Sequence, residues 1–160
     1  MKEALATYLN DHLAGANMAV DLLCLLHEHQ PEPDLKVFLH ALLVEVSEDR
    51  DTLQHLVEEL GQSPSALKNS AAWLAAQVVS LKLRAGLDAF GTFESLEFLT
   101  LGILGKLQLW KALQRCSIGA GTIHVDFVRL IGRAEAQYGE VEKRRLEVAA
   151  QVFSSHAETT

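Results

Sequence analysis

The chain has little proline and little cysteine, and it lacks the signals of β-strands. Only three of its 160 residues are proline, and no stretch alternates regularly between apolar and polar residues, as a half-buried strand would. Cys24 and Cys116 belong to neither a CxxC pair nor a Cys/His cluster, so we expect both to be reduced packing residues. These absences argue against a β-sheet protein and against a disulfide framework.

The chain also lacks a positive charge excess and a long apolar run. Its formal net charge is −7, whereas nucleic-acid and anionic-membrane partners usually require a basic face. The longest apolar stretch, residues 98–105, is too short to cross a bilayer. The first residues are mixed polar rather than apolar, which predicts no ordinary secretory signal. We therefore expect a cytoplasmic protein with no nucleic-acid or membrane partner.

What remains is typical of an all-helical domain. Apolar residues make up 49% of the chain, and Ala, Leu, Glu and Gln are abundant. A chain of this length can bury a substantial core without a metal or a disulfide. We expect one helical-bundle domain over residues 1–153, followed by a frayed polar tail over 154–160.

Helix-breaking and helix-capping residues divide the chain into five predicted helices. The expected helices cover residues 1–29, 34–60 with Asp34 as N-cap, 63–86, 93–115 with Thr92 as N-cap, and about 121–153. Four of them can form a bundle, with residues 63–86 as a lengthwise crossover helix between the second and third bundle helices. A five-helix bundle of another topology is the main alternative.

Helical periodicity predicts which side chains face inward. His12 lies on the apolar face of the first helix, and Glu45 and Asp49 interrupt the apolar face of the second, with Glu48 on its flank. In the last helix, Arg133 falls on the outer face. A second polar cluster is expected nearer the other end of the bundle, and it consists of Glu94, Glu97, Tyr138 and Arg145.

Lys106 is the most informative single residue, because nearly all its neighbours over residues 96–113 are apolar. An ammonium group in such a helix must extend to solvent or find an acid. Counting helical rise from the turn at Pro31 and Pro33 places His12, Glu45, Asp49 and Lys106 at one level. We expect Lys106 to form a buried ion pair with Glu45, Glu48 or Asp49.

The helix order resembles that of the ferritin-like superfamily. The stretches Tyr8-Leu-Asn-Asp-His-Leu-Ala-Gly-Ala16 and Gly105-Lys-Leu-Gln-Leu-Trp110 are also similar to a bacterial family, a likeness that implies no activity. The superfamily resemblance implies a four-helix bundle and a candidate dimetal centre built from Glu residues and Glu-x-x-His motifs. No Glu-x-x-His occurs in this chain, and the nearest equivalents are Glu45-Val-Ser-Glu48 and Glu135-Ala-Gln-Tyr138.

Two functions follow from these residues. A protonated Lys106 would repel a dication, which favours a bundle without a metal and with a binding or structural role. The alternative is an iron or manganese site formed by His12, Glu45, Glu48 and Asp49, in an oxidoreductase or a metal-handling protein. A lone histidine on an apolar face is more often a hydrogen-bonded core residue than a ligand.

The fourth predicted helix is apolar nearly all round, so something must cover it. The crossover helix is one candidate, through Leu67, Leu74 and Leu81. A second copy of the chain is the other, with apolar anchors around Trp73 and Trp110. We expect a homodimer.

Overall fold

The structure is a computed structural model that describes residues 2–59, 88–116, 118 and 125–154. In these residues it contains four helices and no strand: α1 (Lys2–His29), α2 (Pro33–Glu59), α4 (Ala89–Arg115) and α5 (Phe127–Ser154). The all-helical prediction is confirmed. The predicted crossover helix over 63–86, Trp73 and the tail after residue 154 lie outside the described residues.

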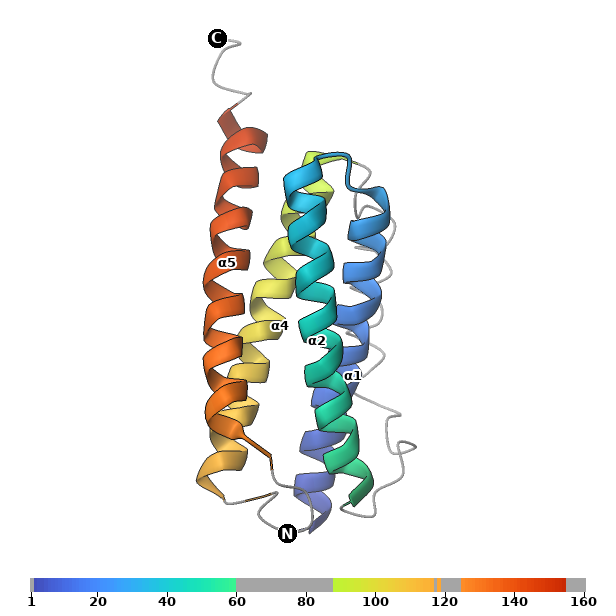
Figure 1. Ribbon diagram of the computed structural model, residues 1–160, viewed down its shortest axis with the longest axis vertical. Coiled ribbons are helices and arrows are strands. Elements are labelled where there is room, and N and C mark those ends of the chain that lie inside the picture. The colour runs from blue at the N-terminus through green and yellow to red at the C-terminus, as the bar shows by residue number, and fades with distance from the viewer. Residues whose placement is uncertain (1, 60–87, 117, 119–124, 155–160) are drawn as a thin grey trace.

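The four helices stand side by side in an antiparallel bundle (Figure 1). The closest neighbours are α4 with α5 and α1 with α2, α1 also packs on α4, and α2 and α5 are the most loosely packed of these four neighbouring pairs. Chain direction makes each of these pairs antiparallel, so α2 and α4 run parallel on one diagonal (Figure 1). Glu59 and Asp88 consequently lie at opposite ends of the bundle.

Side-chain caps fix where α2 and α4 begin. In both helices the capping residue differs from the one expected. Glu32 accepts hydrogen bonds from the backbone N–H groups of Asp34 (2.9 Å) and Leu35 (2.5 Å), so the cap precedes Asp34. Asp88 caps α4 by accepting from Gly91 N–H at 2.6 Å. Thr92 lies inside α4 and bonds the Asp88 carbonyl instead, so the prediction of Thr92 as N-cap was wrong.

The last helix starts later than expected, at Phe127. The Asp126 carboxylate accepts a hydrogen bond from Arg129 N–H at 3.0 Å, which satisfies a donor that the first turn leaves free. The glycines at 119 and 121 suggested an earlier start, but a local cap decides the position of a helix end more directly than a nearby glycine.

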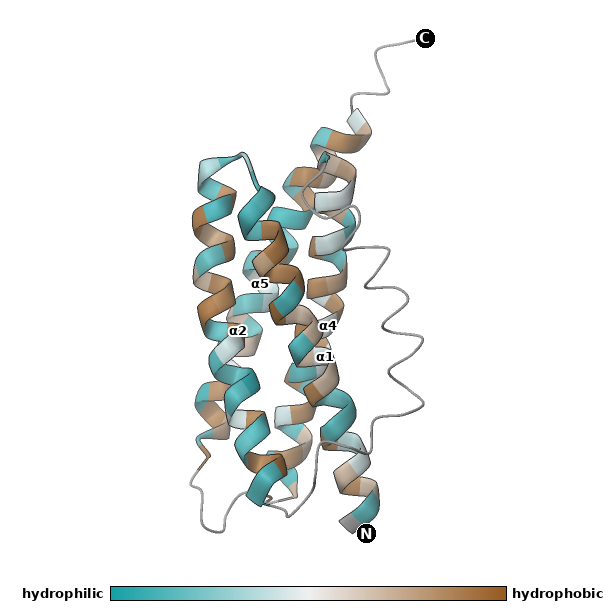
Figure 2. Cartoon of the chain, turned by 90° about the vertical axis from the view of Figure 1, so that its right-hand side faces the viewer, coloured by the Kyte–Doolittle hydropathy of each residue, from teal (hydrophilic) through white to brown (hydrophobic). Residues whose placement is uncertain are grey.

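The apolar core is divided into two clusters along the bundle. One contains Leu22, Leu39 and Leu96, and the other contains Leu9, Leu56 and Trp110. Between them, Asp49 and Gln137 are buried polar residues. Figure 2 shows apolar and polar residues interspersed along each helix, as expected of helices with one buried face.

None of the four described helices combines the length and apolarity needed to cross a bilayer.

Candidate functional site

A buried carboxylate holds the centre of the bundle together. Asp49 of α2 is 1% exposed, and its Oδ2 accepts a hydrogen bond from Lys106 Nζ of α4 at 2.5 Å. Its Oδ1 accepts from Arg133 Nη2 of α5. A single acid therefore links three helices, and both of its oxygens carry a charged donor.

The bonds continue from this carboxylate to the neighbouring acids. Lys106 Nζ also donates to Gln137 Oε1 at 2.6 Å, and Gln137 Nε2 donates to Glu45 Oε2 at 2.8 Å. Arg133 Nη1 donates to Glu48 Oε2 at 2.6 Å. We call these six residues (Glu45, Glu48, Asp49, Lys106, Arg133 and Gln137) the polar layer.

The layer contains three carboxylates and two cations. Burial lowers the pKa of Lys106, and attraction to Asp49 opposes that shift. Burial acts in the same direction on Arg133, but Asp49 and Glu48 outweigh it and raise the pKa of that guanidinium. Each cation is thus held by an acid whose own charge would otherwise be uncompensated in the core.

The predicted ion pair of Lys106 is confirmed, and its partner is Asp49. The placement of Arg133 on the outer face was wrong, because its long side chain reaches across the wide space between α5 and α2 to bond Asp49 and Glu48. Gln137 was not predicted at all. Its spacing from Ala134 and Val141, both buried, puts it on the inner face of α5 and was a readable signal.

The donor atoms of this layer do not fit a dimetal centre. Both Asp49 oxygens face protein cations, and Glu45 and Glu48 accept from Gln137 and Arg133. Among the described residues, no group of three or more His, Cys, Asp or Glu side chains is placed to hold a metal ion. His12 and Asp49 line the same groove, but within the described residues no hydrogen bond joins them.

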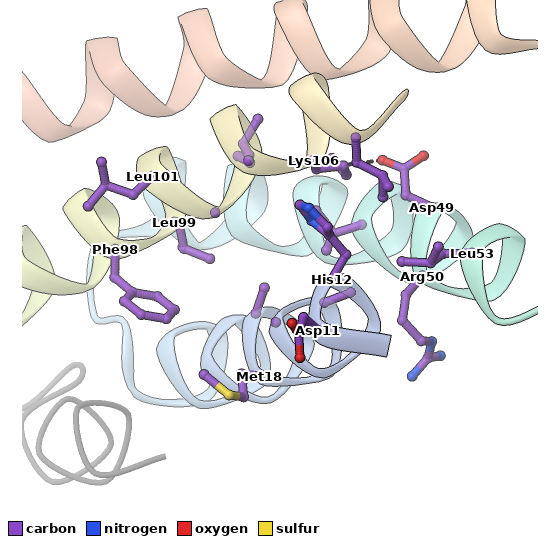
Figure 3. A pocket seen from close by; sticks show the side chains of 18 of the residues that line it. Asp11, His12, Met18, Asp49, Arg50, Leu53, Phe98, Leu99, Leu101 and Lys106 are labelled. Atoms are coloured by element: carbon purple, nitrogen blue, oxygen red, sulfur yellow. Dashed lines mark hydrogen bonds and ion pairs between the residues drawn. The ribbon is translucent and has the colours of Figure 1, made fainter. Parts of the chain in front are cut away.

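A groove of about 770 Å³ opens between α1, α2 and α4 on the other side of the layer (Figure 3). It is lined by Tyr8, Asp11, His12, Gly15, Ala16, Met18, Ala19, Val46, Asp49, Arg50, Leu53, Glu94, Glu97, Phe98, Leu99, Leu101, Gly102, Ile103, Gly105, Lys106, Leu109 and Trp110.

Missing side chains create the groove. Gly15 of α1 and Gly102 and Gly105 of α4 all line it, with Ala16 and Ala19 beside them. Within the described residues, a Cβ placed on Gly15 or Gly102 would meet nothing within 4 Å, and one on Gly105 would lie 4.0 Å from His12 Cε1. In this part of the chain the space is therefore open at the glycines themselves.

Polarity varies along the groove. Figure 3 places Phe98, Leu99 and Leu101 towards one side and His12, Lys106 and Asp49 towards the other. Glu94 and Glu97, which lie within about one turn of Phe98 on α4, also line the groove, so its apolar section lies between these carboxylates and the polar groups around His12. An elongated hollow with an apolar section beside polar groups is complementary to an amphiphilic molecule.

His12 is the partly buried imidazole at the polar end. Its ring meets Tyr8 edge to face, with 4.6 Å between ring centroids. Its ring nitrogens have no hydrogen-bond partner among the described residues. Burial lowers the pKa of His12, which the nearby Asp11 carboxylate only partly opposes, so the ring is neutral at pH 7.

The predicted second polar cluster is formed in part. Arg145 bonds Glu97 at 3.2 Å and makes two bonds of 2.7 Å to Glu142. These contacts raise the pKa of Arg145 and lower that of Glu142, chiefly through their shared hydrogen bonds. Glu94 lines the groove, and Tyr138 is partly exposed. The cluster is a surface ion pair beside the groove.

Trp110 and the cysteines differ from their expected roles. Trp110 is fully buried, so it is no exposed anchor for a second copy, and its indole nitrogen has no partner in the part of the chain that the structure describes. Cys24 and Cys116 are free, as expected, but both are exposed rather than packed in the core.

Comparison of the chain with protein-family models, with curated proteins and with solved structures finds no match.

Proposed function

We propose that this chain is a binding protein of ferritin-like architecture, without a dimetal centre, that takes up an apolar organic molecule in the groove between α1, α2 and α4. The observation that carries the proposal is the groove itself. Its volume of about 770 Å³ lies within the range of small-molecule sites, and its lining is mostly apolar, with charged and polar side chains around His12 and at Glu94 and Glu97.

The polar layer supports this function because it joins α2, α4 and α5 at the centre of the bundle. Asp49 joins α2 to α4 and α5 through two cations, and Gln137 joins Lys106 to Glu45. A bundle connected in this way needs no inorganic charge at its centre. The groove can then exist before a ligand arrives, which reduces the entropy cost of binding.

The proposal also includes the two remaining expectations, a homodimer and a cytoplasmic location. The partly exposed Phe90 and Leu104 of α4 offer apolar surface for a homodimer. The acidic composition agrees with a cytoplasmic protein.

The test is titration with the uncharged fluorescent probe N-phenyl-1-naphthylamine. We expect saturable binding of one probe per chain in the wild type and a strong loss of affinity in Gly102→Leu, whose side chain would occupy the groove. Gly139→Leu is the matched control, because Gly139 is also a helical glycine with open space at its Cβ but lies outside the groove.

Equal binding by the wild type and Gly102→Leu would place the probe elsewhere and overturn the proposal. No saturable binding by a folded wild type would do the same. Metal analysis of the same preparation, with stoichiometric iron or manganese that is lost in His12→Ala, would support the alternative metal site instead.

A further inference from the structure

We infer that the ligand of this groove carries an uncharged oxygen head group that hydrogen-bonds to His12, on an apolar tail that extends towards Phe98 and Leu101. The inference rests on the proposed function and adds the chemical class of the ligand. A primary alcohol is the simplest member of that class.

The charges around the groove disfavour an anionic head. The acids of the polar layer outnumber its cations, and the Lys106 ammonium at the groove already bonds Asp49 and Gln137. Asp11 also lines this end, and the groove-lining Arg50 is paired with Asp51 at 2.7 Å. A carboxylate brought here would lose its hydration and approach Asp11 and Asp49, while both cations that line the groove already have acid partners.

A cationic head is disfavoured for a different reason. It would have to approach the ammonium of Lys106, which shares the polar end with His12 (Figure 3). The acids of the layer are already bonded to protein donors, so a second cation would compete with those bonds. An uncharged head avoids both the repulsion and most of the desolvation cost.

His12 supplies the complementary chemistry. A neutral imidazole has one N–H donor and one acceptor nitrogen, and a hydroxyl group can serve as the partner of either. The ring is half-buried, lies on the groove and has no hydrogen bond within the described part of the chain. A head group at this position would satisfy it, while the tail covers the apolar lining.

The experiment measures displacement of N-phenyl-1-naphthylamine by three ligands of equal chain length: 1-decanol, 1-chlorodecane and decanoate. In the wild type at pH 7.5 we expect decanol to be the strongest competitor. In His12→Phe, which keeps an aromatic ring but has no ring nitrogen, we expect the advantage of decanol over chlorodecane to shrink about three- to tenfold, as for the loss of one hydrogen bond.

This ratio separates the two proposals. If the probe binds and Gly102→Leu blocks it, but the decanol-to-chlorodecane ratio is the same in the wild type and His12→Phe, the groove binds ligands and the inference about His12 is wrong. If decanoate competes best, the charge argument is wrong. If the probe does not bind at all, the proposed function itself has failed.

A second measurement avoids mutation. The ¹⁵N NMR resonances of the His12 ring report hydrogen bonding at each nitrogen, and we expect decanol, but not chlorodecane, to shift one of them in the wild-type protein. Unchanged His12 resonances at saturating decanol would contradict the inference even if His12→Phe were unstable.

Discussion

The spaces on the two sides of α4 differ in how side chains fill them. Between α2 and α5, the most loosely packed neighbours, the long side chains of Lys106, Arg133 and Gln137 fill the space. Lys106 and Arg133 both bond Asp49, and Gln137 joins Lys106 to Glu45. Between α1 and α4, glycines leave the space unfilled. One side is filled by bonded polar side chains, and the other is hollow and mostly apolar.

The difference shows how a bundle can be stable and still contain a cavity. Empty apolar space costs stability because its lining loses contacts. Here the polar layer and the two leucine-rich clusters on either side of it hold the helices in place, so the groove does not collapse. The predictions below test first the polar layer and then the groove.

The largest expected effect is on the polar side. Asp49→Ala removes the acid that both Lys106 and Arg133 contact and leaves two cations without their shared partner. We expect the free energy of unfolding to fall by about 3–5 kcal/mol, measured by urea denaturation. A loss below about 1 kcal/mol would show that the layer does not hold the bundle together.

Removing one cation should cost less. In Lys106→Met the methionine keeps the apolar stem, and Arg133 still bonds Asp49. We expect a loss of about 1–3 kcal/mol in the same measurement. The double variant Lys106→Met/Arg133→Met should lose more than the sum of the two single variants, because only then is Asp49 stranded.

On the hollow side, Gly102→Leu should raise stability. Replacing a glycine inside a helix by leucine gains about 0.5–1 kcal/mol from helix propensity, and Gly139→Leu should gain a similar amount. Thermal denaturation measures both. The two variants should differ in probe binding but not in the sign of their stability change, and a destabilised Gly102→Leu would mean that the groove is narrower than described.

The smallest expected effect is the pH dependence from His12. Burial holds the pKa of His12 in the folded state below its ordinary value of 6.5, so the unfolded chain binds the proton more readily. Stability should therefore fall as the pH decreases below 6.5, and His12→Gln should flatten that part of the curve. Urea unfolding at pH 7.5 and at successively lower pH measures the slope, and identical slopes in both proteins would contradict a neutral, half-buried His12.

Parts of the site could be read from the sequence because they follow from helical periodicity. Lys106 in an apolar helix had to find an acid, and Asp49 interrupted the inner face of its own helix. Arg133 could not be placed in this way, because periodicity gives the direction of a Cβ and not the reach of a long side chain. The groove also escaped prediction, since three glycines on two helices mark a hollow only after those helices are paired.

The sequence by itself determined the helical class, the approximate extent of the helices and the presence of a buried ion pair, because these depend on local propensity and on the period of apolar residues. Only the tertiary structure decided that Asp49 takes two cations and that α1 and α4 enclose a groove. Both depend on the separation between helices, which is set by packing among residues far apart in the chain.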